Sequence, residues 1–381
     1  MNRKDAATAT SEIRSAVGPK EKPPGRLISL DAFRGITIAG MILVNNPGTW
    51  SHVYPPLRHA EWHGWTPTDF VFPFFLFIVG VAMTFSLPKL ADNRAGLYLK
   101  ILRRSAIIFG IGLFLNFVPD FSFSTLRIPG VLQRIAVVYL FASLITVNTG
   151  VKGQVYWFGG LLLSYWAMMK LIPVPGIGAG VLTPEGQLGA YIDNSILHGH
   201  MYRETWDPEG LLSTIPAIAT TLSGVLTGHL LRSKKDKMET AGQLFVIGWV
   251  AIVAGLLWGI FFPINKAIWT SSYVIFTSGA ALQFLAFCYW LIDAKGYQKW
   301  ARPAIIFGMN SIAVYALAEL MSDVLSAIPL GSNSLRSWIF ENLFQSWASP
   351  INASLMFALA MVFFCFLVMA YLYKKRIFIR V

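Results

Sequence analysis

Ten continuous apolar stretches limit what this chain can fold into more than any other feature of the sequence. All but residues 104–118 reach the roughly 20 residues that a helix needs to cross a bilayer. The runs do not alternate between apolar and polar residues, so spanning β-strands are excluded. The stretches are residues 28–46, 66–88, 104–118, 130–148, 154–173, 210–231, 242–262, 268–292, 303–328 and 352–373.

The composition supports the same class. Of 381 residues, 55% are hydrophobic and only 13% are charged, whereas soluble proteins average about 25% charged residues. So little charge excludes a soluble enzyme, a disordered chain and, with two cysteines inside apolar runs, a disulfide scaffold. We therefore predict an all-α polytopic membrane helical bundle with about 10 transmembrane helices.

The basic residues indicate the orientation. With the N-terminus inside, 23 Lys and Arg residues fall on the cytoplasmic side and six on the other side, as the positive-inside rule requires. Both termini are predicted to be cytoplasmic. Residues 1–25 are expected to form a disordered cytoplasmic tail without a signal peptide, and residues 26–381 the transmembrane domain. The net charge of +12 is spread over short loops, so we predict no nucleic-acid partner.

Polar residues inside a span are costly and are candidates for function. Asp31 and Arg34 share a helix face, and they could form a local ion pair or present Arg34 to an anion in a cytoplasmic cavity. Gln133 and Arg134 begin a span, where an arginine can also extend to the membrane surface. The remaining candidates are Asn45, Asn46, Asp69, His229, Asn310, Glu319 and Asp323.

The first long outside loop, residues 47–65, contains the densest cluster of candidate catalytic residues. His52, His59 and His63 lie within twelve positions, and Asp69 opens the next apolar run. A His–Asp pair commonly orients an imidazole as a general base. Two alternatives remain: ordinary interfacial histidines, or a metal site using His59 and His63. The spacing is not that of His-Glu-x-x-His and lacks a third ligand, so we predict no metal.

A second long outside loop, residues 174–209, is acidic and aromatic. Such a loop suits recognition of a polar ligand on the outer side. Its candidate residues are Tyr191, Asp193, Trp206, Asp207 and Glu209.

Several motifs resemble a known family. The segment Ser29-Leu30-Asp31-Ala32-Phe33-Arg34-Gly35 resembles the start of the transmembrane acyltransferase superfamily. Further segments resemble the heparan-α-glucosaminide N-acetyltransferase family, whose bacterial members are grouped as NagX-type acyltransferases. These segments are Leu43–Asn46, His59–Thr66, Asp69–Gly80, Arg127–Arg134, Asp207–Gly210 and Gly308–Ser311.

This resemblance implies a membrane enzyme that takes acetyl from cytoplasmic acetyl-CoA and places it on the amine of a terminal glucosamine or related amino sugar across the membrane. It implies His59, Asn45 and Asp69 as catalytic residues. The lysosomal members carry Asn where this chain has His63, and they have a large luminal domain before the membrane domain. The expected location is the inner (plasma) membrane of a cell, as a multi-pass protein.

Roles for the other candidates follow from this chemistry. A neutral His59 would take the amine proton, Asp69 would fix its tautomer, and Asn45 would donate to the developing oxyanion. We favour direct transfer over an acetyl-histidine. The expected acetyl-CoA contacts are Arg34, Arg103, Arg104, Gln133 and Arg134, although Arg134 could face the acceptor instead. The expected acceptor contacts are Trp62, His63, Asp193, Trp206, Asp207, Glu209 and Asn310.

Two other functions fit the polar residues in the spans. One is a permease for N-acetylglucosamine or its oligomers, and the other is O-acylation of an envelope glycan. The oligomeric state stays open, with a homodimer among the options.

Overall fold

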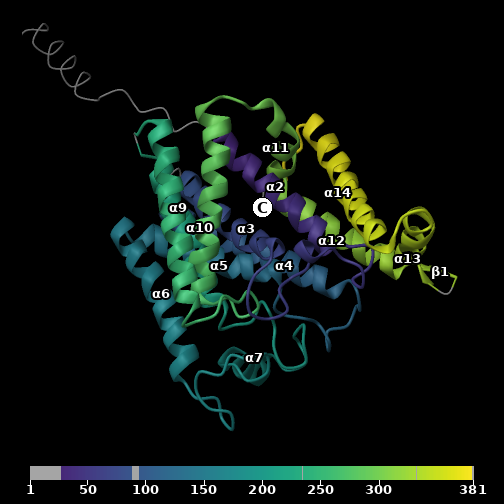
Figure 1. The fold of residues 1–381 in the computed structure, drawn as a ribbon, viewed down its shortest axis with the longest axis horizontal. Coiled ribbons are helices and arrows are strands. Elements are labelled where there is room, and N and C mark those ends of the chain that lie inside the picture. The colour runs from purple at the N-terminus through teal and green to yellow at the C-terminus, as the bar shows by residue number, and fades with distance from the viewer. Residues whose placement is uncertain (1–26, 88–93, 234, 332, 380–381) are drawn as a thin grey trace, which may run out of the picture.

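The computed structural model describes residues 27–87, 94–233, 235–331 and 333–379, so the predicted tail 1–25 lies outside the described residues. The structure is almost entirely helical (Figure 1). The main helices are α2 (Ile28–Asn45), α3 (Val71–Ser86), α4 (Arg94–Phe117), α5 (Val131–Asn148), α6 (Val151–Leu171), α7 (Leu188–Leu197), α8 (Thr214–Leu231), α9 (Lys237–Gly259), α10 (Ser271–Cys288), α11 (Arg302–Met309), α12 (Ser311–Ala327), α13 (Leu335–Ile339) and α14 (Pro350–Lys374).

Short elements extend or connect these helices. Strands β1 (Pro329–Leu330) and β2 (Asn333–Ser334) form an antiparallel hairpin. Three single 3₁₀ turns and two π-helical turns complete the described secondary structure. They are Pro55–Leu57, Pro67–Phe70 and Lys299–Ala301, and Tyr289–Ala294 and Phe340–Gln345.

All ten predicted apolar stretches are helical, which confirms the all-α polytopic class. Among the described residues, seven helices are long and apolar enough to cross a membrane, or eight if α11 and α12 count as one span. These two helices meet at a 72° bend. The long helices α4 and α6 are outside this group, and the stretch predicted as an outside loop, 174–209, includes the ten-residue helix α7.

Glycines allow the central helices to approach closely. On α3, a Cβ at Gly80 would lie 1.9 Å from the Thr221 carbonyl oxygen of α8. On α2, a Cβ at Gly35 would lie 1.7 Å from the Ala304 carbonyl oxygen of α11. Small residues at such crossings let backbones pack directly in a membrane, where apolar burial gives no advantage over lipid. The glycine of the Ser29–Gly35 motif is therefore explained by helix packing.

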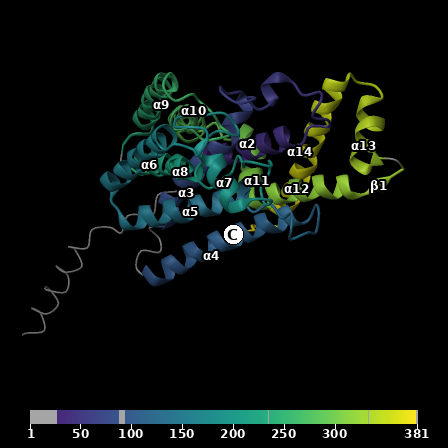
Figure 2. The same cartoon turned by 90° about the horizontal axis from the view of Figure 1, so that it is seen from below.

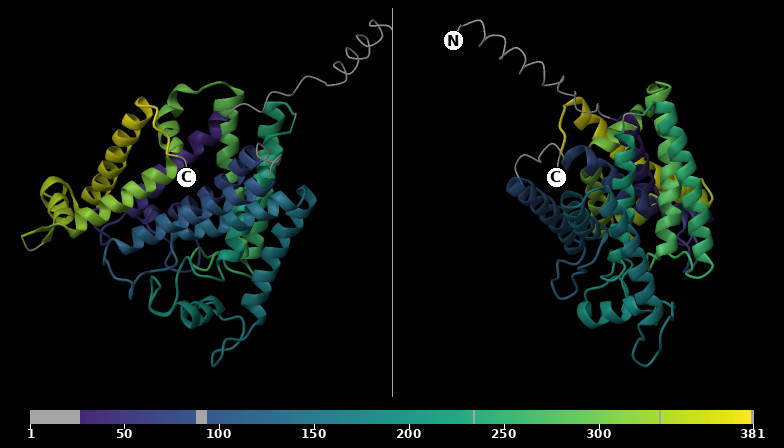
Figure 3. Two further views of the ribbon diagram at one scale, coloured as in Figure 1. Left: turned by 180° about the vertical axis from the view of Figure 1, so that it is seen from behind. Right: turned by 90° about the vertical axis from the view of Figure 1, so that its left-hand side faces the viewer.

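The elements are arranged around α2, α3 and α8. Helices α9 and α10 pack side by side along one flank, and α13, the hairpin and α14 form the opposite flank (Figures 1 and 3). Helix α4 lies against α5 on one face (Figure 2). The α2–α3 loop and the α6–α8 connection meet at one end of the bundle, because Trp62 Nε1 donates to the Leu182 carbonyl at 2.7 Å. The predicted loops thus form one surface.

Candidate active site

His59 and Asp69 are in direct contact, as the sequence predicts. His59 Nδ1 lies 2.7 Å from Asp69 Oδ1. The Asp69 side chain is 1% exposed and the His59 side chain is 41% exposed. Because a carboxylate only accepts hydrogen bonds, we assign the Nδ1 proton to His59. Nε2 then carries the lone pair, as a general base requires.

Local sequence holds the Asp69 carboxylate in place. Asp69 Oδ2 accepts from Thr66 N at 2.9 Å, from Ala60 N at 3.1 Å and from Thr66 Oγ1 at 3.1 Å. Thr66 and Asp69 form a capping box around the helical turn that leads into α3. Tyr273 of α10 also donates its hydroxyl to the Asp69 carbonyl at 2.5 Å. The acid is therefore fixed by the fold before any ligand binds.

Lys266 is a third member of this site that the sequence analysis did not single out. Its Nζ lies 2.9 Å and 3.1 Å from the two ring nitrogens of His59 and 3.7 Å from Asp69 Oδ1. Burial lowers the pKa of Lys266, although Asp69 and Glu209 act in the opposite direction. Only chain folding brings positions 59 and 266 together, so no local motif pointed to this lysine.

Two tryptophans, one from each long loop, pack against each other. The rings of Trp62 and Trp206 pack edge to face with centroids 5.3 Å apart. His63 is exposed, and its Nδ1 lies 3.3 Å from Asn265 Nδ2 rather than against Asp69. Trp62 and Trp206 thus form a half-buried aromatic wall of the kind that binds sugar rings by their apolar faces.

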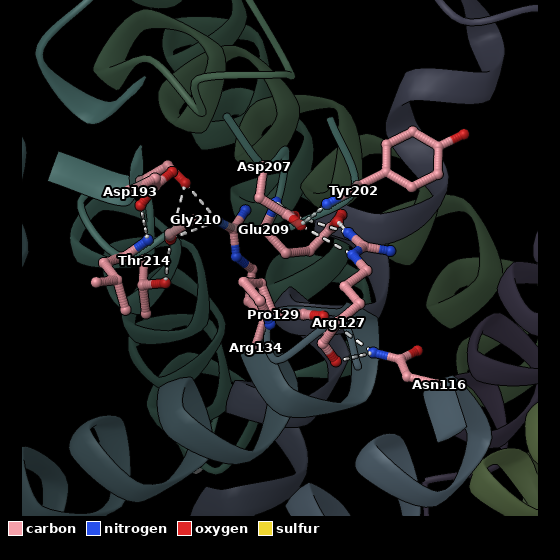
Figure 4. A network of polar contacts seen from close by, with 12 residues as sticks. Asn116, Arg127, Pro129, Arg134, Asp193, Tyr202, Asp207, Glu209, Gly210 and Thr214 are labelled. Carbon is pink, nitrogen blue, oxygen red and sulfur yellow. Dashed lines mark hydrogen bonds and ion pairs between the residues drawn. The ribbon is translucent and has the colours of Figure 1, made fainter. Parts of the chain in front are cut away.

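Arg127, Asp207 and Glu209 form an ion-pair network (Figure 4). Arg127 Nε donates to Asp207 Oδ2 at 2.8 Å, and its Nη2 donates to Asp207 Oδ1 at 2.7 Å and to Glu209 Oε2 at 2.6 Å. Burial acts to raise the pKa of Asp207, but the Arg127 contacts outweigh it and the pKa is lowered. The Asp207 carboxylate is fully buried. Both of its oxygens accept hydrogen bonds from Arg127. The Glu209 side chain is 11% exposed and lies nearer the surface.

Asp193 of α7 is buried beside this network. Its Oδ1 accepts from Leu211 N at 2.8 Å, and a Cβ at Gly210 would lie 1.9 Å from its Oδ2. Only glycine fits there, which explains the end of the Asp207–Gly210 motif. Burial is the main reason that the pKa of Asp193 rises to about 6.

Gln133 and Arg134 do not line the same cavity as the other predicted acetyl-CoA residues. Arg134 is 2% exposed, donates to the Gly210 carbonyl at 3.1 Å and to Ser213 Oγ, and lies over the Trp269 ring. It therefore packs against the residues that follow the second long loop and not in the cavity that Arg34 lines. Gln133 is packed where Gly112 and Gly130 leave room for its side chain.

The other predicted acetyl-CoA residues share a cavity of about 820 Å³. Arg34 of α2 and Arg103 and Arg104 of α4 line it together with Lys100. Within the described part of the chain, the buried Arg104 Nε has no hydrogen-bond partner. The cavity also follows α3 from Phe75 to Ser86 and Leu87, so its inner end begins six residues from Asp69, about 9 Å along a helix.

The two predicted asparagines lie apart from each other. Asn45 ends α2 at the end that leads into the histidine loop, and it makes no hydrogen bond to His59 or Asp69 in the described structure. Asn310 lies at the bend between α11 and α12, where its side chain contacts residues 377 and 379. It is therefore beside the 820 Å³ cavity and not with the acceptor residues. Among the described residues, no group of three or more His, Cys, Asp or Glu residues could hold a metal ion.

Comparisons with known proteins assign the chain to a family. A sequence model described as "Heparan-alpha-glucosaminide N-acetyltransferase, catalytic" matches residues 26–257. Proteins named heparan-alpha-glucosaminide N-acetyltransferase from Mus musculus and Homo sapiens are 31% and 30% identical over 358 and 360 residues, which cover 78% and 79% of this chain. The chain spans about half the length of these relatives, 54% in each case. The match over residues 26–257 shows that the chain belongs to the heparan-α-glucosaminide N-acetyltransferase catalytic family.

Proposed function

We propose that this protein is a membrane acetyltransferase that moves acetyl from cytoplasmic acetyl-CoA to the amine of a terminal glucosamine or related amino sugar on the outer side of the membrane. The single observation that carries the proposal is the His59–Asp69 contact of 2.7 Å, in which the His59 side chain stays 41% exposed. An amine attacks only when it is neutral, and histidine is the side chain suited to take its proton near neutral pH.

The 820 Å³ cavity fits an acyl-CoA in size and charge. Ligand pockets commonly measure about 300–1,000 Å³, and arginine is well suited to phosphate contact. Arg34, Arg103 and Arg104 would hold the phosphates, and the buried Arg104 Nε has an unused donor for them. When bound, acetyl-CoA supplies an acetyl thioester. The sorting of basic residues over the loops supports entry from the cytoplasm.

The protein's residues then have separate tasks. His59 Nε2 accepts the amine proton, and Asp69 holds the Nδ1 proton and stabilises the imidazolium. Lys266 lies within reach of the same imidazole. Trp62 and Trp206 would bind the sugar ring, and Asn45 is the proposed amide donor to the developing oxyanion. A base role explains His59 fully, so direct transfer is favoured over an acetyl-histidine.

Purified protein given acetyl-CoA and glucosamine should release free CoA. His59→Ala should lower this rate by about 10²–10⁴-fold, the usual contribution of a general base. His52→Ala is the matched control, because His52 is an exposed histidine in the same loop. Retained activity in His59→Ala would exclude the base role.

Acceptor and transport assays separate the alternatives. Acetylation only of hydroxyl acceptors in a panel would replace the amine proposal with O-acylation. Uptake of labelled N-acetylglucosamine into proteoliposomes without acetyl-CoA, and no CoA release with any acceptor, would favour a permease.

A further inference from the structure

The chain folds back on itself after α14. Helix α14 ends at Lys374, and Arg376 adopts a left-handed φ of 58°. Arg376 N donates to the Tyr373 carbonyl at 3.0 Å, and Ile377 N donates to the Leu372 carbonyl at 2.9 Å. These two bonds are the Schellman pattern that commonly ends a helix, although glycine is the usual residue at the left-handed position. A residue that holds this conformation without being glycine needs support from its surroundings.

Asn310 supplies that support. Its Nδ2 donates to the Ile377 carbonyl at 3.2 Å, and its Oδ1 accepts from Ile379 N at 2.9 Å. The Asn310 side chain thus pairs with the backbone on both sides of Phe378, as a neighbouring strand would. Asn310 is 2% exposed at the bend between α11 and α12. We name residues 375–379 the return segment; its path from α14 toward α2 and α11 is visible in the left view of Figure 3.

The return segment contributes to the basic cavity. Phe378 and Ile379 line it, as do Asp31, Arg34 and Gly308. The Phe378 ring is half-buried and packs against Tyr373 with centroids 6.4 Å apart. The phosphate-binding candidates and an anchored aromatic ring therefore border the same cavity. An aromatic ring beside arginines suits a nucleotide, because a base can stack on the ring while the phosphates contact the guanidinium groups.

We propose that the return segment is a fixed wall of the donor cavity, that Phe378 contacts the purine nucleotide end of the acyl donor, and that Asn310 is the positioning residue that holds this wall. The proposal rests on the proposed function and deepens it at the donor end. The return segment lies beyond residues 26–257, the part of the chain that the family comparison matches. Asn310 thereby acts on the donor side and not on the acceptor.

The test compares a donor that has the nucleotide with one that lacks it. Phe378→Ala should raise the KM for acetyl-CoA about tenfold, in keeping with the loss of one base–aromatic stack. Its kcat, its KM for S-acetylpantetheine and its KM for the amino sugar should stay unchanged. Phe378→Tyr should restore the wild-type KM. Asn310→Ala should act like Phe378→Ala, with its fold checked by thermal melting. Phe363→Ala is the matched control, since Phe363 is a phenylalanine of α14 that is 61% exposed.

Equilibrium binding keeps the inference separate from the proposed function. Binding of CoA and of pantetheine to the detergent-solubilised protein needs no acceptor, and Phe378→Ala should weaken only CoA binding. Equal KM changes for both donors, or none, would overturn the inference while leaving acetyl transfer intact. A lower KM for acetyl-CoA in the variants would show instead that the segment obstructs the cavity. If wild-type protein neither binds CoA nor releases it from acetyl-CoA, the proposed function itself fails.

Discussion

Replacing Asp69 with asparagine should test the catalytic pair more sharply than removing the histidine. The Asp69 Oδ2 atom accepts from three donors on Ala60 and Thr66, and Oδ1 accepts from His59 Nδ1. In Asp69→Asn the amide oxygen must stay on the three-donor side, because an NH₂ group there would face two backbone N–H groups. The NH₂ group then faces His59 Nδ1, which must become the acceptor. The proton moves to Nε2, and the base loses the lone pair that would accept the amine proton.

The expected loss is about 10³–10⁴-fold in kcat, comparable with the same change in Ser-His-Asp enzymes and equal to about 4–5 kcal/mol. Stability should change little, because the three Oδ2 hydrogen bonds persist. The assay is initial CoA release at saturating acetyl-CoA and amino sugar, with melting measured in parallel. Asp120→Asn is the matched control, since Asp120 is exposed. A kcat within about threefold of wild type would refute the tautomer argument, as would a loss explained by unfolding.

Three other substitutions test the surroundings of this pair. Lys266→Met removes an Nζ that lies 2.9 Å and 3.1 Å from the two ring nitrogens of His59, so kcat/KM for CoA release should fall about tenfold, the cost of about one lost side-chain hydrogen bond; an unchanged kcat/KM would contradict a role for this lysine in the site. Arg127→Leu leaves the buried Asp207 carboxylate unpaired and should cost about 3–5 kcal/mol of stability, with partial recovery in the double variant Arg127→Leu/Asp207→Asn, measured by denaturation. The pKa of Asp193 is raised from 3.8 to about 6, so the folded protein binds this proton more tightly than the unfolded chain does. The protonated side chain therefore adds stability below about pH 4, and this contribution is lost as the pH rises through 6. Asp193→Asn should therefore be more stable than wild type at pH 7.5, by up to about 3 kcal/mol, and the gap should close toward pH 4; a pH-independent gap would contradict the shift.

Periodicity and composition were sufficient to predict the helices, and local spacing was sufficient to predict the contact between His59 and Asp69. His59 and Asp69 are ten residues apart on one loop, so the chain between them limits how far they can separate. The Arg34, Arg103 and Arg104 set was predicted from residue type, and its members do share one cavity. Gln133 and Arg134 begin the same helix as cavity residues Ile135 and Tyr139, yet they do not line that cavity. Sequence position along a helix does not determine which neighbour a side chain meets.

The sequence by itself determined that this protein is an all-α membrane bundle and that candidate catalytic residues are concentrated in the α2–α3 loop. Long apolar runs can satisfy their backbone only as helices, whatever their neighbours are. Only the tertiary structure decided that Lys266 lies beside His59, that Arg134 contacts Gly210 and that the Asn310 side chain pairs with the backbone after α14. These contacts join residues 67 to 207 positions apart. They depend on which helices pack together, and no local pattern of residue types specifies that choice.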